Sequence, residues 1–206
     1  MVVAALVAAV VVTAAGIAAV RQLAPLASYS MSSASMEPTL TSGDVVLVLG
    51  ARGLCRHPAV RPGDVVVFRK PLSGQVRYLH RLVAGPGATV SMRDGLLTID
   101  GRPVSRRLEP GVRDDFPDNP PDVAPQVFRE TLPDGVSYLT RDLGPDGDVD
   151  NFEPVRLGPD QWFELGDNRD NARDSRSDGP VAGKDLCGVA AWILTSKDSA
   201  KVGSRP

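Results

Sequence analysis

The N-terminal stretch is the feature that most constrains the fold of this chain. Residues Val2–Val20 carry no charged side chain and consist almost wholly of Ala, Val, Leu and Ile. As an α-helix, with a rise of about 1.5 Å per residue, this run matches the ~30 Å hydrocarbon core of a bilayer. The sequence therefore predicts one transmembrane anchor over residues 1–21. A cleaved secretory signal, which ordinarily has a basic segment ahead of a shorter apolar run, and a buried core helix remain the alternatives.

Beyond the anchor, frequent Gly and Pro residues indicate a mainly β protein built from short strands separated by turns. It contains 20 Gly and 18 Pro, and no stretch after residue 27 repeats apolar residues with a helical period for three turns. Arg93-Asp94-Gly95 has the composition of a hairpin turn. Runs of β-branched and aromatic residues bounded by Gly, Pro or Asp predict strands at Asp44–Leu49, Asp64–Lys70, Val76–Ala84, Leu96–Asp100, Val136–Thr140, Trp162–Leu165 and Gly188–Thr195.

The stretch 101–160 differs in composition from its flanks. It holds ten Pro and 13 Asp or Glu against seven Arg and no Lys. Such a composition favours irregular loops or a small insertion over core strands. We therefore expect a β core in two parts, 22–100 and 161–206 with a C-terminal tail, separated by an acidic, Pro-rich, loop-rich insertion at 101–160.

Charge and residue counts exclude several classes of function. The formal net charge is −2, which rules out a general electrostatic grip on nucleic acid. Two cysteines and two histidines are too few for a four-ligand structural zinc site or a multi-histidine metal centre. Whether Cys55 and Cys187 pair as a disulfide depends on geometry and stays open.

Three segments contain residues suited to chemistry. In Tyr29–Leu40 (YSMSSASMEPTL), a serine precedes a turn at Pro38, where its backbone N–H can point at a group approaching its hydroxyl. In Gln75–Gly87, His80 lies on a predicted strand and is the side-chain type that accepts protons near neutral pH. Gly166–Arg176 (GDNRDNARDSR) alternates acids, amides and arginines, which can form a hydrogen-bonded lattice that holds a base. Taken singly, a solvated Ser-rich linker and a structural strand histidine are the better explanations of the first two.

The order of these segments resembles type I signal peptidases of serine peptidase family S26. Ser-Met-x-Pro-Thr-Leu is followed by Gly-Asp-Val-Val-Val-Phe, then His80 beside Arg81, then Gly-Asp-Asn-Arg-Asp-Asn, and the resemblance runs from about Tyr29 to Ile193. It implies an antiparallel signal-peptidase/LexA-like catalytic core outside the cytoplasm. By the same resemblance Ser35 is the nucleophile, and Ser33 donates its hydroxyl to the oxyanion hole beside the Ser35 N–H.

Three positions depart from the bacterial pattern of this family. Bacterial members carry Lys as the general base where this chain has His80, Ser where it has Ala172, and Pro where it has Ser32. The endoplasmic-reticulum and archaeal branch uses Ser, His and Asp. The resemblance to that branch makes His80 the general base and Asp174 the carboxylate that orients it.

The function implied by this resemblance is that of a single-pass membrane serine endopeptidase that removes signal peptides from exported preproteins at A-x-A-like sites. Preproteins and membrane lipid are the expected partners, and neither a metal nor an organic cofactor is implied. A specialised S26 maturation protease for one pro-protein and an inactive, membrane-anchored peptide-binding relative remain alternatives. By resemblance, shallow pockets for an extended substrate are lined by Tyr29, Met31, Met36, Leu40, Tyr78 and Leu79.

Overall fold

The computed structural model describes residues 26–50, 55, 59–70, 76–110, 125–144, 147 and 149–206. The predicted anchor at residues 1–21 and His57 lie outside this part of the chain. Within it, none of the helices has the length and apolar character needed to cross a membrane.

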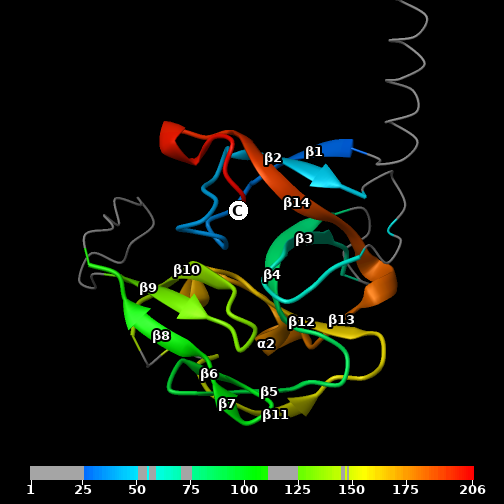
Figure 1. Ribbon diagram of the computed structural model, residues 1–206, viewed down its shortest axis with the longest axis vertical. Coiled ribbons are helices and arrows are strands. Elements are labelled where there is room, and N and C mark those ends of the chain that lie inside the picture. Colours follow the sequence, from blue (N-terminus) through cyan, green and yellow to red (C-terminus); the bar gives the residue numbers. More distant parts are fainter. Residues whose placement is uncertain are drawn as a thin grey trace, which may run out of the picture.

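Seven antiparallel strands form the main sheet, in the order β1-β2-β14-β3-β4-β12-β13 (Figure 1). The ten-residue β14 joins its two sides, because its first half pairs with β3 and its second half with β2. Three irregularities interrupt these pairings, as expected where a long strand bends with a curled sheet. The strands are β1 (Leu26–Ser30), β2 (Val45–Leu49), β3 (Val65–Phe68), β4 (Tyr78–Ala84), β12 (Gln161–Leu165), β13 (Val181–Ala182) and β14 (Leu186–Thr195).

In Figure 1 one of two smaller antiparallel sheets lies to the left, with β8, β9 and β10, and the other at the bottom, with β5, β6, β7 and β11. One has the order β10-β9-β8 and the other β11-β5-β6-β7. The predicted hairpin turn is confirmed, since Asp94 and Gly95, with φ of 48° and 72°, connect β5 to β6. The strands are β5 (Thr89–Arg93), β6 (Leu96–Ile99), β7 (Arg102–Pro103), β8 (Ser105–Leu108), β9 (Gln126–Thr131), β10 (Ser137–Asp142) and β11 (Phe152–Arg156).

The stretch 101–160 is more regular than its composition predicts. Its described residues include β7 to β11, so the expectation of irregular loops needs correction. The physical reason is a small core: Val104, Leu132, Tyr138 and Leu157 are buried in one cluster with residues of β5, β6 and β12. Some polar residues of the stretch are buried as well, but Glu130 and Asp142 are paired with Arg169 and Arg106, so their charges do not prevent strand formation.

Helical structure is minor in the described part of the chain, as the sequence predicts. It consists of the four-residue α2 (Ser175–Asp178) and the 3-10 helices η1 (Arg169–Asn171), η2 (Gly183–Asp185) and η3 (Ser199–Lys201). Valine-rich β3 is buried along its whole length because neighbours cover both of its faces. The pairing of β3 with β4 and of β4 with β12 then places side chains from distant parts of the sequence around β4.

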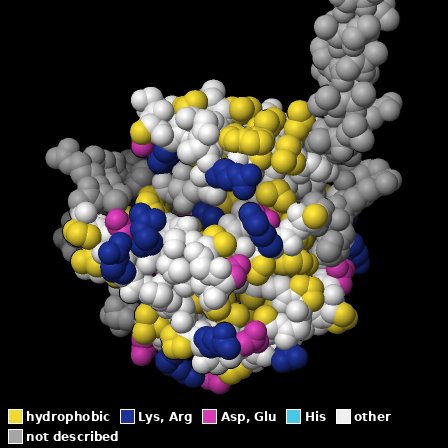
Figure 2. All heavy atoms as spheres, in the orientation of Figure 1, with side chains coloured by type: hydrophobic (Ala, Val, Ile, Leu, Met, Phe, Trp, Pro, Cys, Tyr) yellow, Lys and Arg dark blue, Asp and Glu magenta, His cyan; other side chains and the backbone are white. Residues whose placement is uncertain are grey.

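Apolar side chains also gather on the surface. Figure 2 shows such a group in the upper part of the visible face, the region that holds β1, β2 and β14 in Figure 1. Leu26 of β1 and Trp192 and Leu194 of β14 are among the large apolar residues that remain exposed. Of these residues, Leu26 belongs to β1, the first described strand of the chain.

Candidate active site

Ser35 lies in the turn that connects β1 to β2, and hydrogen bonds from Asn168 hold this turn in place. Its carbonyl oxygen accepts a hydrogen bond from the backbone N–H of Asn168 at 3.0 Å, and the Asn168 side chain donates to the carbonyl oxygen of Ala34 at 3.0 Å. Ser33 is exposed, and its Oγ lies 3.2 Å from Oγ of Ser35. The loop that begins at Gly166 therefore fixes the backbone on which the Ser35 hydroxyl is presented.

His80 reaches this hydroxyl from the middle of the main sheet. It lies on β4, which is flanked by β3 and β12, and only 3% of its surface is exposed. The ring packs beside that of Phe68, with 5.7 Å between centroids. Nε2 of His80 lies 3.1 Å from Oγ of Ser35. The structure thus brings together the serine and the histidine that are 45 residues apart in the sequence.

The other ring nitrogen of His80 meets a carboxylate that the sequence analysis missed. Nδ1 lies 2.6 Å from Oε2 of Glu164, a fully buried residue of β12. Burial raises the pKa of Glu164, and the neighbouring His80 acts in the opposite direction. One signal could have identified this residue: Glu164 is the sole charged residue in the apolar strand Trp162–Leu165 (WFEL), where a charge requires a partner.

Asp174 does not take the place that the family resemblance assigns to it. Its carboxylate caps the N-terminus of α2 and accepts hydrogen bonds from the backbone N–H of Arg176 and from Nε and an Nη of the same residue. It also accepts from the backbone N–H of Gly166 at 3.0 Å. Through these contacts Asp174 connects the two ends of the loop Gly166–Arg176. The prediction that it orients His80 is therefore corrected.

The expected lattice of charges in that loop is present and reaches the nucleophile turn. Arg81, adjacent to His80, forms a two-point contact with Asp167, from Nε at 2.9 Å and from Nη2 at 2.7 Å. Thr39, on the nucleophile turn, donates to the same carboxylate. Arg169 is buried against Glu130 of β9. Buried two-point arginine–carboxylate contacts have a defined geometry, and they hold the turn and the loop in one position.

The six residues expected to line substrate pockets fall into two groups. Met36 and Leu40 are fully buried, and Met31 and Leu79 nearly so, in one core cluster with residues of β2, β3 and β14. Their side chains belong to the core, so the expectation that Met36 and Leu40 line shallow substrate pockets is corrected. Tyr29 and Tyr78 are half-buried and retain surface that a ligand can contact.

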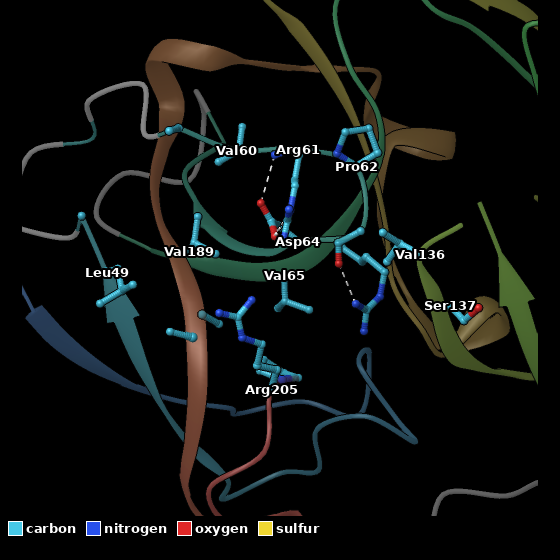
Figure 3. A pocket seen from close by; sticks show the side chains of 17 residues that line it. Leu49, Val60, Arg61, Pro62, Asp64, Val65, Val136, Ser137, Val189 and Arg205 are labelled. Carbon is cyan, nitrogen blue, oxygen red and sulfur yellow. Dashed lines mark hydrogen bonds and ion pairs between the residues drawn. The ribbon is translucent and has the colours of Figure 1, made fainter. Parts of the chain in front are cut away.

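Two cavities lie near these residues. One of about 600 Å³ has Tyr78 and Glu164 in its wall, together with Lys70 and Asp178. Another, of about 830 Å³, is lined by Leu49, Val65, Val189 and Arg205 and by Arg61 paired with Asp64, and neither Ser35 nor His80 belongs to its wall (Figure 3). Ser35 and His80 are absent from the wall of the smaller cavity as well, but Glu164, which contacts His80, belongs to that wall.

The lysine nearest to His80 in the sequence and the two cysteines all have partners in the structure. Lys70, the lysine nearest to His80 in the sequence, donates hydrogen bonds to Asp178 and to the carbonyl oxygen of Arg173. Cys55 and Cys187, whose pairing the sequence left open, form a disulfide. In the described part of the chain, His, Cys, Asp and Glu side chains form no group of three or more that could hold a metal ion.

A serine hydroxyl on an imidazole, with a buried carboxylate at the other ring nitrogen, is the arrangement of hydrolases that act through an activated serine. Residues 4–195 match the family described as signal peptidase, peptidase S26, and the chain belongs to this family.

Individual relatives agree with this assignment. The chain is 33% identical to a signal peptidase I of Rickettsia typhi over 178 residues, 82% of this chain and 62% of that protein. It is 32% identical to a signal peptidase I of Rickettsia prowazekii over 157 residues, 72% of this chain and 54% of that protein. The chain therefore spans little more than half the length of these relatives. The crystal structure of a signal peptidase I from Enterococcus faecalis aligns with a TM-score of 0.38 at 24% identity, covering 64% of this chain and 97% of that one.

Proposed function

We propose that this protein is a membrane-anchored serine endopeptidase that removes N-terminal signal peptides from exported preproteins at A-x-A-like sites. The observation that carries the proposal is the 3.1 Å hydrogen-bond distance between Ser35 Oγ and His80 Nε2 in a chain of the signal peptidase family. Ser35 is the nucleophile and His80 the general base in this proposal. The base is therefore an imidazole at the position where bacterial relatives are expected to have a lysine.

The chemistry follows from the positions of the two residues. His80 Nε2 accepts the hydroxyl proton while Ser35 Oγ bonds to the scissile carbonyl carbon, and the carbonyl oxygen becomes an oxyanion. The Ser35 N–H and the Ser33 hydroxyl are the donors for that oxyanion. His80 then gives the proton to the departing amine as the C–N bond breaks, which leaves an acyl ester on Ser35. Water, deprotonated by His80, hydrolyses the ester and releases the signal peptide with a new carboxylate.

The location of the protein belongs to the same proposal. An anchor at residues 1–21 would hold the catalytic part beside the membrane, on the extracytoplasmic side. Exposed apolar side chains of β1, the first described strand, and of β14, which lies two strands away in the same sheet, are consistent with a position at the bilayer surface. Signal peptides emerge from the bilayer, so an anchored protease meets its substrate at high local concentration.

The proposal is tested with the full chain in detergent and a preprotein that carries an A-x-A site. We expect cleavage after the second alanine, and a loss on the order of 10³-fold or more in kcat for Ser35→Ala with an unchanged melting temperature. Ser204→Ala, a change at an exposed serine remote in sequence, is the matched control. A wild-type protein that binds such peptides without cleaving them would instead identify an inactive peptide-binding relative. Cleavage of one pro-protein alone would identify a specialised maturation protease.

A further inference from the structure

We propose that Glu164 is the positioning residue for His80, so that the site operates as a Ser35–His80–Glu164 triad. The inference rests on the proposed function for its catalytic consequence, but the hydrogen bond itself can be measured without a substrate. It assigns a role to a residue of β12 that the signal-peptidase motifs in this chain do not include. It also gives Glu164 and Asp174, ten residues apart in the sequence, separate tasks.

The first argument is the direction of the hydrogen bonds. With Glu164 ionised, as the proposal has it, the carboxylate can only accept, and the 2.6 Å contact with Glu164 Oε2 then places the ring proton on Nδ1 of His80. Nε2 then presents its lone pair to the Ser35 hydroxyl, 3.1 Å away. This is the tautomer that a general base needs, and the carboxylate selects it. When Nε2 takes the serine proton, the imidazolium charge forms next to Glu164 inside a buried site, where the attraction is strong.

Second, in the described part of the chain, His80 is the one side chain that forms a hydrogen bond with the Glu164 carboxylate. Oε1 of Glu164 is buried and makes no hydrogen bond there, and the backbone N–H of Glu164 is bonded separately, to Oγ of Ser175. Asp174, by contrast, uses both of its oxygens to hold Arg176 and the N–H of Gly166. The hydrogen bond of the Glu164 carboxylate can therefore orient the His80 ring, whereas the hydrogen bonds of Asp174 stabilise the loop Gly166–Arg176.

The third argument is electrostatic. Burial raises the pKa of Glu164, so the ionised side chain is placed where the protein disfavours it. The charged groups that act on it are His80 of β4 and Lys70 after β3, which favour the ionised form, and Asp174 after η1, which opposes it. A charge kept in such a place, bonded to the ring of the proposed base, is typical of functional rather than structural carboxylates.

The structural test uses the small number of histidines. The chain has two, His57 and His80, so ring signals in proton and nitrogen NMR spectra can be assigned with His57→Gln. For the full chain in detergent, we expect the Nδ1–H tautomer of His80 and a strongly downfield ring proton. Glu164→Gln should move that proton upfield and mix the tautomers, while the matched variant Asp174→Asn keeps both features. Retention of both features in Glu164→Gln, or their loss in Asp174→Asn alone while that variant keeps the wild-type circular dichroism spectrum, would overturn the inference.

The kinetic test separates positioning from structural support. Glu164→Gln should lower kcat for preprotein cleavage by about 10²- to 10⁴-fold with little change in KM, because binding does not involve the carboxylate. Glu164→Asp, which keeps the charge on a shorter arm, should recover part of the loss. Wild-type kcat in a folded Glu164→Gln variant would overturn the inference. If the wild type cleaves no preprotein, the proposed function fails, and the NMR measurement still decides whether Glu164 sets the tautomer.

Discussion

Glu164 is the residue at which the demands of folding and of the proposed chemistry differ most clearly. Its carboxylate is fully buried with one hydrogen-bonded partner, and burial raises its pKa. A group whose pKa is raised on folding stabilises the folded state below the pKa of the unfolded chain, and that contribution is lost as pH rises through the higher folded value. At neutral pH the ionised Glu164 therefore costs folding free energy.

This sign predicts an unusual pH dependence for Glu164→Gln. Glutamine is neutral at every pH and can still accept a hydrogen bond from the His80 ring, so it avoids the cost of a buried charge. We expect the melting temperature of the variant, relative to wild type, to rise as pH increases from below the ordinary glutamate pKa of 4.5 to neutrality. Thermal unfolding of both proteins across that range measures the difference. A difference that falls with pH would contradict the raised pKa.

At the same scale, Ser35 and His80 give a second pH expectation. Protonated imidazole has no lone pair at Nε2 and cannot accept the Ser35 proton, so kcat/KM should fall as pH decreases.

At the scale of elements, one strand pairing and one loop position Ser35, His80 and Glu164. Strand pairing between β4 and β12 brings Glu164 opposite Leu82, close to His80, and the loop Gly166–Arg176 holds the turn that carries Ser35. The loop is itself closed by Asp174, which is buried with Arg176. Strands thus supply the base and its partner, and a loop supplies the nucleophile position.

Asp174→Asn tests the structural role of that loop. It removes the charge that pairs with buried Arg176 and leaves that arginine without a compensating carboxylate on this side. Loss of one partner of a buried ion pair typically costs about 3–5 kcal/mol, so we expect a lower free energy of unfolding on that order. Denaturant unfolding of the full chain in detergent measures it. Glu153→Gln, at an ion pair with Arg93 in which both side chains are largely exposed, is the comparison and should cost much less. Equal effects in the two variants would contradict the assignment.

At the scale of the whole molecule, the disulfide joins distant parts of the main sheet region. Cys55 lies between β2 and β3, and Cys187 lies on β14, 132 positions later. Closing so long a segment restricts the unfolded chain strongly in the chain-entropy account. Cys187 is buried in the core cluster that also contains Met36 and Leu40, two residues of the segment that follows Ser35.

Removal of this disulfide should therefore weaken the whole domain. For the double variant Cys55→Ser and Cys187→Ser we expect the free energy of unfolding to fall by about 2–5 kcal/mol, with a lower melting temperature. Wild-type protein treated with reductant serves as the second arm and should behave alike. A variant as stable as the oxidised wild type would show that the covalent link does not contribute.

The features that the sequence determined by itself are local ones, namely individual strands and turns. Short valine-rich runs bounded by Gly, Pro and Asp form strands, and Asp94-Gly95 forms the turn of its hairpin, because these preferences depend on neighbouring residues alone. Ser35 and His80 were found from motifs of a few residues each. At 101–160 the sequence predicted the strand at Val136–Thr140, close to the observed β10, but the other described strands of this stretch were missed, since their stability comes from a core shared with β5, β6 and β12 rather than from their own composition.

The tertiary structure alone decided which carboxylate reaches His80. Asp174 and Glu164 are both near Gly166 in the sequence, and motif resemblance favoured Asp174. The outcome depends on the register between β12 and β4, 84 residues apart at the Glu164–His80 contact, and on the capture of Asp174 by Arg176. The burial of Met36 and Leu40 and the pairing of Cys55 with Cys187 were decided in the same way. Such contacts are set by how distant segments pack, because a sheet places residues side by side by strand order and register rather than by distance along the chain.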